Sequence, residues 1–469
     1  MADTGGVTRT GTIRNGDVGV LSAGDVNLEV YISPALGGSD TDIRQFVGEV
    51  NIFEDIFKNG LYGNILIIDA ASLAAQLPII GDEYITIRAT TPGMKQQIYR
   101  TFKVYSMTDR MMIRDTNTQS YILHFCSPEL FIDLMTPLYS RYTGTIQDVV
   151  NQIWGESVAV PRTGEGGPSP LTIVGNPANN VTFISPGWSA LKCVNWLAAR
   201  ALPGDLKAPN FLLYESNKSF YFASIESIIN QSKSSGKIFN DYYYMANNIS
   251  KPSGDAGSPN ASNSGADSRY VKDIDNEYKK VEEFRVVETF NAFKNNLNGY
   301  YANRLITFDL RNKKYEIFDY DHVSSFDEYT HLENIDGASG VAPFRPDTLR
   351  DPAEYITFYP QHDQMYDFVS DNPQDRISEI LPRRYSTVQE LSNFKIEITV
   401  PGRTDIEVGA IVKFHFPDSV VRDPSDKNQG GEDKYYTGYY LVSAIRHKIT
   451  LQKHMMILEL AKDSFHTKA

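Results

Sequence analysis

Two short segments of the sequence combine carboxylates with histidine, the residue types that bind metal ions or transfer protons. One segment contains Asp319, Asp321 and His322, and the other is the pair His362 and Asp363. Such side chains act as ligands, or as general acids and bases, only when the fold aims them at one point. We favour the plainer interpretation, in which both segments are exposed turn residues.

A second group of residues would suit carbohydrate chemistry. The adjacent carboxylates Glu282 and Glu283 could act as a glycosidase pair. The aromatic rings of Trp154, Trp188 and Trp196 could form a platform for a sugar. Adjacent carboxylates are more simply solvated charges, and tryptophans at helical spacing more simply pack in a core, so we favour those interpretations.

The remaining candidates for chemistry are isolated residues. His447 and His454 flank a predicted hairpin turn and could meet across it as metal ligands, although ordinary surface histidines are the default. The sequence has no Gly-x-x-x-x-Gly-Lys-Ser/Thr loop, no His-Glu-x-x-His pair and no Gly-x-Ser-x-Gly elbow. We therefore expect no catalytic residue, no cofactor and no metal site, and thus no enzyme.

Composition also narrows the function. The chain has 45 basic and 58 acidic residues and a net charge of −13, which disfavours a broad grip on nucleic acid but allows DNA to pass through a surrounding protein. The only cysteines, Cys126 and Cys193, lie far apart and predict folding in a reducing compartment. We find neither an N-terminal secretory signal nor an apolar run long enough to span a membrane.

The pattern along the chain predicts a mainly β protein with mixed α and β lobes. Alternating apolar and polar residues predict strand after strand between residues 26 and 127, and again in the last 80 or so residues. Helical spacing dominates parts of residues 128–250. The predicted segments are an N-terminal arm at 1–25, a first β domain at 26–127, an outer α/β domain at 128–250, a flexible linker at 251–277, a split second β domain at 278–320 and 386–466, and an inserted outer lobe at 321–385.

The most informative signal is similarity between the two ends of the chain. Three blocks recur in the same order, and in the first of them Gly81–Arg88 aligns with Gly409–Phe416. In the second block Phe102 aligns with Tyr440, an offset of 338 residues, and in the third Tyr121 aligns with Met456, an offset of 335. A turn three residues shorter in the later copy would explain the difference. Chance similarity of alternating strands is the alternative to a true repeat.

These blocks also carry a resemblance to a known family. The cues are Phe394–Gly402, Glu407–Gly409 and Tyr436–His447, together with Trp188–Ala201 and the strand pair near Asn210–Phe222. In this ordered combination the chain resembles the central baseplate hub protein of contractile-tailed bacteriophages of the T-even type. The resemblance covers residues from about 25 to 465.

The resemblance implies two tail-tube-like antiparallel β-barrel or sandwich domains per chain and a homotrimer that forms a pseudo-hexameric ring. That ring would join a trimeric spike to the hexameric tail tube, contact other baseplate proteins and the tape measure protein, and let DNA pass through its lumen. The location implied is the tail baseplate of the virion, after assembly in the host bacterial cytoplasm.

A tube wall requires strands with polar residues on one face and apolar residues on the other. The residues that we expect on the ring or lumen strands are Lys103, Tyr105, Arg110, Ser443, Arg446 and Lys448. Two rival functions stay open at this point. One is a tail module that binds carbohydrate on a host surface, and the other is a hydrolase of cell-wall glycan.

Overall fold

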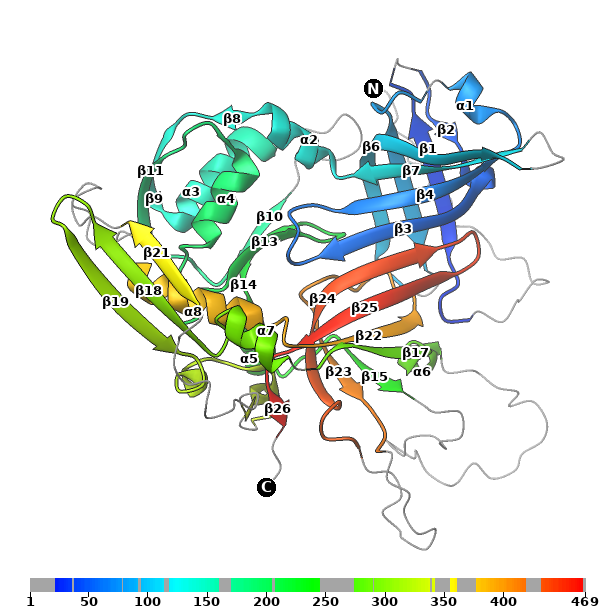
Figure 1. The fold of residues 1–469 in the computed structure, drawn as a ribbon. Coiled ribbons are helices and arrows are strands. Elements are labelled where there is room, and N and C mark those ends of the chain that lie inside the picture. Colours follow the sequence, from blue (N-terminus) through cyan, green and yellow to red (C-terminus); the bar gives the residue numbers. More distant parts are fainter. Residues whose placement is uncertain are drawn as a thin grey trace, which may run out of the picture.

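The structure is a computed structural model of the chain, drawn in Figure 1. It describes residues 22–466 except 36–37, 78, 92–93, 114–117, 160–169, 205–206, 245–273, 290, 338–339, 342–354, 361–376 and 419–431. Most of the predicted arm and linker therefore lie outside the described residues. None of the described helices is long and apolar enough to cross a membrane.

The first β region forms an antiparallel sheet with the strand order β1-β5-β6-β7-β4-β3. Short β2 (Thr41–Asp42) extends it at β1, and η1 (Arg44–Phe46) and α1 (Leu73–Gln76) lie in its connections. Every strand expected between residues 26 and 127 is present. The strands are β1 (Asn27–Ser33), β3 (Val47–Asp55), β4 (Tyr62–Asp69), β5 (Tyr84–Thr90), β6 (Gln97–Met112) and β7 (Gln119–Cys126).

A mixed α and β region follows, as the sequence predicts. The Thr145 hydroxyl caps α3 by accepting a hydrogen bond from the amide of Asp148 at 3.1 Å, and its apolar stripe is buried. The elements of this region are α2 (Pro128–Met135), β8 (Pro137–Leu138), β9 (Arg141–Thr145), α3 (Ile146–Ile153), η2 (Trp154–Val158), β10 (Leu171–Val174), β11 (Asn180–Ile184), β12 (Trp188–Ser189), α4 (Ala190–Ala198), β13 (Phe211–Glu215), β14 (Phe220–Ser224) and α5 (Ile225–Ser235).

The second sheet has the order β15-β23-β24-β25-β22-β17, and short β16 (Lys280–Val281) pairs with β15. Strand β15 lies within residues 128–250 yet pairs with β23, so the end of that region belongs to this sheet. Helix α6 (Ile274–Glu277) precedes β16. The strands are β15 (Asn240–Tyr244), β17 (Glu283–Glu288), β22 (Phe394–Pro401), β23 (Ile411–His415), β24 (Gly438–Ile449) and β25 (His454–Lys462).

The two sheets repeat one strand order. Strands β5, β6, β7, β4 and β3 of the first sheet correspond in sequence to β23, β24, β25, β22 and β17 of the second. Strands β1 and β15 occupy the same outer position, but β1 is antiparallel to β5 whereas β15 is parallel to β23. A shared order over five strands, with the same antiparallel pairings, is what a duplicated β domain would give.

Strand register supports the offsets read from the sequence. Val104 lies opposite Phe125 and Val442 lies opposite Leu460, which keeps the offsets of 338 and 335, and a β-bulge follows both pairs. The first block shifts by one residue. The amides of Val104 and Val442 donate to the carbonyls of Glu83 and Ala410, both at 2.9 Å, so these two carbonyl residues correspond.

The three-residue difference between the offsets has two sources. The connection between β24 and β25 spans 450–453, whereas that between β6 and β7 spans 113–118, so the later turn is shorter by two residues. The third residue is Asp109 of β6. Its φ of 53° is left-handed, and the register against β7 shifts between Thr108 and Met111.

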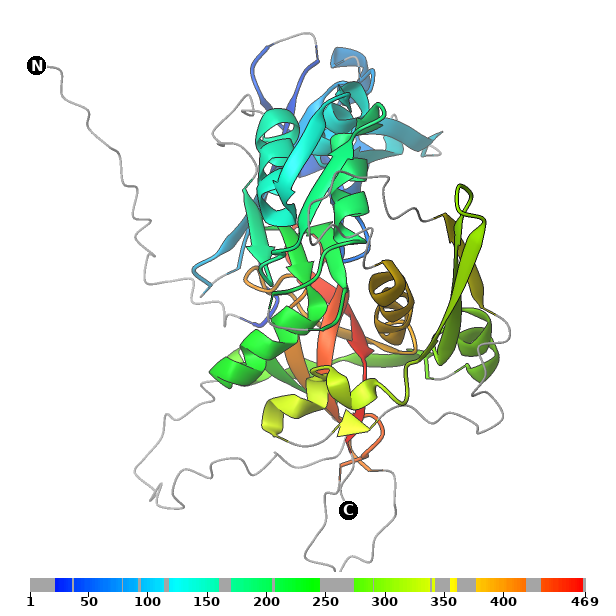
Figure 2. The ribbon, with the colours of Figure 1, turned by 90° about the vertical axis from the view of Figure 1, so that its left-hand side faces the viewer.

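The hairpin expected within the second β domain lies elsewhere. β18 (Ala302–Asp309) and β19 (Lys314–Asp321) form a separate sheet with β21 (Ile356–Pro360), against which α8 (Ile377–Glu390) packs (Figure 2). The sequence analysis placed residues up to 320 in the second β domain, but the hairpin of β18 and β19 belongs to this separate sheet. A hairpin pattern in the sequence does not specify which further strand pairs with the hairpin. The other elements here are α7 (Ala292–Leu297), η3 (Phe326–Glu328), η4 (Leu332–Asp336), β20 (Gly340–Val341) and β26 (Phe465–His466).

Three apolar cores underlie these regions. One lies in the first sheet, one in the second sheet and one in the α/β region around α3 and α4. Two residues link the cores of the two sheets. Ile449, the last residue of β24, is buried in the core of the first sheet, and Ile56, which follows β3, is buried in the core of the second. The two sheets are thus packed as one body.

Candidate functional site

The most distinctive site is the junction where the two sheets meet edge to edge. β24 pairs antiparallel with β3, with Ile449 opposite Val50 and Ala444 opposite Asp55 at the ends of the ladder. Figure 1 shows β24 directly below β3. The first part of β24 pairs with β23 instead, so β24 changes its partner at the bulge between Val442 and Ala444. Through this junction the two sheets become one sheet of 14 strands.

One face of the junction is apolar and has a buried polar centre. Val50, Ile52 and Ile449 are fully buried there. Beside them, Glu54 Oε1 lies 2.8 Å from His447 Nε2, and His447 Nδ1 lies 3.1 Å from His454 Nε2. A buried polar chain of this kind depends on internal hydrogen bonds, and within the described residues one atom of it, His454 Nδ1, is buried without a hydrogen-bond partner.

The two histidines correct one expectation. They meet across the hairpin, as the sequence suggested they could, but both are fully buried and not on the surface. Burial, together with the neighbouring His447, lowers the pKa of His454 well below its ordinary value. Among the described residues no group of three or more potential ligands is placed to hold a metal ion.

The opposite face of the junction is polar and carries two cations around one carboxylate. Arg446 Nε donates to Asn51 Oδ1 at 2.9 Å, and its guanidinium lies 3.6 Å from Glu49. Lys448 Nζ lies 3.3 Å from the same carboxylate. The charged side chains are partly exposed, 40% for Arg446, 44% for Lys448 and 27% for Glu49, so each ion pair contributes little stability.

The other residues expected on the ring strands are divided between the two faces. Tyr105 and Ser443 occupy the matching bulges, and Tyr105 is exposed whereas Ser443 is buried and donates to Glu459. Lys103 forms an ion pair with Asp82. Arg110 donates to Gln119 Oε1 at 2.9 Å. The extra residue Asp109 turns Arg110 towards the side of Gln119, so Arg110 is not the structural counterpart of Lys448.

The carboxylates and histidine between residues 319 and 322 do not converge. Asp319 is held by Arg304, with contacts of 2.6 and 2.8 Å, and the hydrogen bond from that guanidinium lowers the pKa of Asp319. Asp321 accepts hydrogen bonds from the backbone of a turn. His322 is buried, with Nε2 at 3.4 Å from Glu390. The expectation of exposed turn residues is therefore wrong for His322, whose ring packs among aromatic side chains.

The carbohydrate candidates do not form a site in the described residues. Glu282 and Glu283 are exposed at the start of β17. Trp154 is buried against Phe220, and Trp188 and Trp196 pack against the core of the α/β region. The pair His362 and Asp363 lies outside the described residues.

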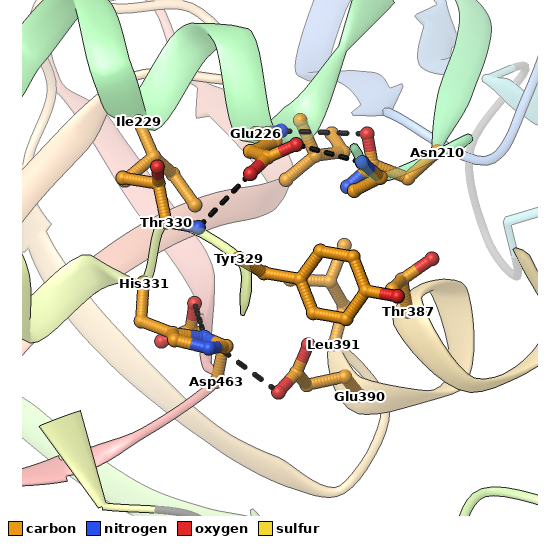
Figure 3. Close-up of a pocket in the computed structure, with 12 residues that line it drawn as sticks. Asn210, Glu226, Ile229, Tyr329, Thr330, His331, Thr387, Glu390, Leu391 and Asp463 are labelled. Atoms are coloured by element: carbon orange, nitrogen blue, oxygen red, sulfur yellow. Dashed lines mark hydrogen bonds and ion pairs between the residues drawn. The ribbon is translucent and has the colours of Figure 1, made fainter. Parts of the chain in front are cut away.

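A small buried cluster, shown in Figure 3, was missed by the sequence analysis. His331 lies 3.3 Å from Asp463 and 3.8 Å from Glu390, while Glu226 accepts hydrogen bonds from the amides of Ala208 and Thr330. These residues come from α5, from α8, from the loop before η4 and from the residue that follows β25. The cavity between them measures about 20 Å³, which is the room of a single water molecule.

The electrostatics of this cluster fit a structural role. Burial alone would lower the pKa of His331, but Asp463 and Glu390 outweigh it and raise the pKa to about 9. A histidine with a raised pKa stabilises the fold fully below about pH 6.5, and this stabilisation is lost as the pH rises through about 9. The cluster therefore joins the inserted lobe to the second sheet and has no room for a substrate. No spacing pattern in the sequence could reveal this cluster, because its residues lie far apart along the chain.

No protein-family model matches the sequence, and no curated protein matches it. Among solved structures, the chain is similar to the tail protein from Neisseria meningitidis MC58, with 11% identity, a TM-score of 0.46 and coverage of 93% of this chain and 97% of that one. It is similar to the 43 kDa tail protein of prophage MuSo2 from Shewanella oneidensis, with 9% identity, a TM-score of 0.45 and coverage of 93% and 98%. A third is the E. coli c3393 protein, a component of the type VI secretion system described as structurally similar to the T4 bacteriophage tail proteins gp27 and gp5, with 7% identity, a TM-score of 0.39 and coverage of 90% and 76%. The structural neighbours are thus phage tail proteins and a secretion-system component.

Proposed function

We propose that the chain is a structural hub in the baseplate of a contractile phage tail, where three copies form a ring. The observation that carries this proposal is the edge-to-edge junction of two sheets with one strand order. Joined with the sequence resemblance to baseplate hub proteins, it gives a chain with two equivalent ring positions. A ring of three such chains has six similar positions, although its true symmetry is threefold.

Symmetry matching is the working principle of this hub. The threefold symmetry of the ring suits a trimeric spike on one side, and its six similar β domains suit a hexameric tail tube on the other. The α/β region and the inserted lobe would contact neighbouring chains and other baseplate proteins. No chemical step is required, since the task is to hold two assemblies of different symmetry on one axis.

The strands of the junction suit the wall of a DNA channel. We assign a lumen-facing role to the polar face of β24 that carries Arg446 and Lys448, and to Lys103 and Tyr105 on β6. Ser443 of β24 is buried against Glu459 and has no part in this assignment. Glu49 lies close to both Arg446 and Lys448 and offsets part of their positive charge, and the chain as a whole has a net charge of −13. A passing polyanion would not adhere strongly to such a wall.

Mass in solution tests this function. The expected result for the purified chain, alone or with its spike partner, is a particle of about three times 52.7 kDa by light scattering, with a ring of six similar densities in rotationally averaged images. A chain that stays monomeric with the spike present would contradict the hub function. A ring whose lumen is lined by a continuous positive stripe would contradict the proposed charge of the channel wall.

A further inference from the structure

Two strand edges of the molecule lack the partner that their counterparts have. In the described part of the chain, no strand pairs with the outer edge of β6 beyond Val104 or with the outer edge of β17. The counterparts of these strands in the repeat are β24 and β3, and those two pair with each other. We propose that the outer half of β6 in one chain pairs antiparallel with β17 of a second copy of this chain. The inference deepens the proposed function and rests on it, because it names the contact that closes the ring.

The internal junction dictates the register of this contact. Ile65 of β4 pairs with Leu123, and Ile398 of β22 pairs with Leu458, so Ile65 and Ile398 hold equivalent positions in the two sheets. Towards the other neighbouring strand, Ile65 pairs with Val50 and Ile398 pairs with Phe284, so Val50 and Phe284 are equivalent as well. By the same steps Ile52 corresponds to Val286. On the other strand, Ile449 and His447 correspond to Met112 and Arg110, since Met112 pairs with Gln119 as Ile449 pairs with His454. Met112 should therefore lie opposite Phe284, and Arg110 opposite Val286.

The irregularities of the two strands complement each other in this register. β6 carries one residue more than β24, at Asp109, and β17 carries one residue more than β3, at Val287, where its register against β22 shifts. In the ladder set by the internal junction, Asp109 falls opposite Val287. Each extra residue would disturb pairing with an unmodified partner, but two that face each other leave the ladder continuous. Two independent insertions would rarely match in this way by chance.

Exposure of apolar side chains gives a separate reason for this contact. In the single chain Met111 and Met112 are 61% and 62% exposed, and Val286 and Val287 are 38% and 44% exposed. Met112 and Val286 correspond to Ile449 and Ile52 of the internal junction, which are at most 1% exposed. Exposed apolar residues on an unpaired strand edge invite pairing with another chain. A second copy of this chain supplies the edge with the matching register.

Head-to-tail contacts of this kind form a closed ring or an open filament, depending on the rotation at each step. If the contact between chains repeats the internal junction, every step in the assembly applies the same rotation. Three copies then give three internal junctions and three junctions between chains. Met112 of one chain would enter the core of the next chain's second sheet, as Ile449 enters the core of the first.

Cysteine cross-linking tests the register directly. A chain with Arg110→Cys and Val286→Cys places two thiols opposite each other across the contact, at a distance that a disulfide can span. Mild oxidation should give covalent dimers and trimers on a non-reducing gel. The control is Arg110→Cys with Arg285→Cys, in which the second thiol points to the other face of the strand and should not cross-link. The native Cys126 and Cys193 are buried.

The outcomes separate this inference from the proposed function. A trimer by mass in which neither pair cross-links would overturn the β6–β17 contact and leave the ring. Cross-linking of the 110/286 pair in particles that are open filaments would support the contact and overturn the trimeric hub. A chain that is monomeric and does not cross-link would overturn both.

A charge substitution provides a second measurement. Met112→Lys places an ammonium group at the position of the buried Ile449 and should raise the dissociation constant of the trimer by about tenfold or more. Because Met112 is exposed in the single chain, the substitution should leave the fold unaffected, as circular dichroism can verify. Tyr99→Lys, on the part of β6 that already pairs with β5, is the matched control and should leave the trimer intact. Equal trimer stability in both variants would contradict the contact.

Discussion

The closed edge between β24 and β3 and the open edges of β6 and β17 share one strand arrangement but differ in composition. The closed edge places β-branched residues and a buried Glu54–His447–His454 chain between the sheets. The corresponding residues of the first sheet are Met112 and Arg110 on β6, which are exposed, and Gln119 on β7, which is partly exposed. The two sheets thus share one backbone pattern, while the side chains at the two edges differ.

The difference reflects when each junction forms. The closed junction forms as the chain folds, so rigid, tightly packed side chains suit it. An open edge must be tolerated in water before a partner arrives. Methionine suits that task because it is flexible and adapts to irregular surfaces. The closed junction therefore contributes to the stability of the chain, whereas the open edges contribute to its assembly.

The largest expected effect is a truncation at the closed junction. Ile449→Ala should lower the free energy of unfolding by about 2–5 kcal/mol, because it removes a fully buried side chain from the core of the first sheet. The matched change at the open edge, Met112→Ala, should alter the stability of the single chain by no more than about 0.5 kcal/mol. Urea unfolding of both variants under dilute conditions measures the difference. Equal losses would mean that the two edges do not differ as described.

Acid should weaken the closed junction through His454. Its pKa is lowered by burial and by His447, so the unfolded chain takes up a proton below about pH 6.5 that the folded chain resists. The free energy of unfolding should therefore fall as the pH drops from 7 to 5. Urea unfolding across this range measures the slope, and His454→Gln should flatten it. The open edge has Gln119 at this position and offers no such proton site. An unchanged slope in the variant would rule out this histidine as the cause.

The smallest effect concerns the polar face of the closed junction. Glu49→Gln removes the carboxylate that faces Arg446 and Lys448 and should cost about 0–1 kcal/mol, with a smaller cost at high salt. The corresponding change on β17, Glu283→Gln, should have no more than a slight effect on the single chain. Thermal unfolding at low and high salt distinguishes these outcomes. A large loss that salt does not reduce would show that Glu49 has a packing role.

Much of the fold could be predicted from local patterns. Alternation along Val26–Ile32 and along Phe102–Met107 marks strands β1 and β6, and the stripe from Ile146 to Ile153 marks α3. The repeat was visible because the strands of both copies keep their order and their alternation, although the connection between β24 and β25 is two residues shorter than that between β6 and β7. The sequence could not show which sheet contains the hairpin 302–321, because the same alternating pattern would suit a hairpin in any sheet with one buried face.

The site was predictable only in part. Arg446 and Lys448 were found because they alternate with apolar residues on one strand. Their partner Glu49 lies nearly 400 residues away, and no local pattern joins it to them. Arg110 was assigned by counting along the strand, and the extra residue Asp109 reversed its side. Counting fails wherever a bulge changes the alternation of faces.

The sequence by itself determined the strands, the mixed α and β region and the order of the repeated blocks, because these depend on neighbours within a few residues. The tertiary structure alone decided that the two sheets join through β24 and β3 and that, among the described strands, the outer edges of β6 and β17 have no partner. Backbone hydrogen bonds between strands can form with any extended partner, so the choice of partner depends on which edges the packed cores bring together.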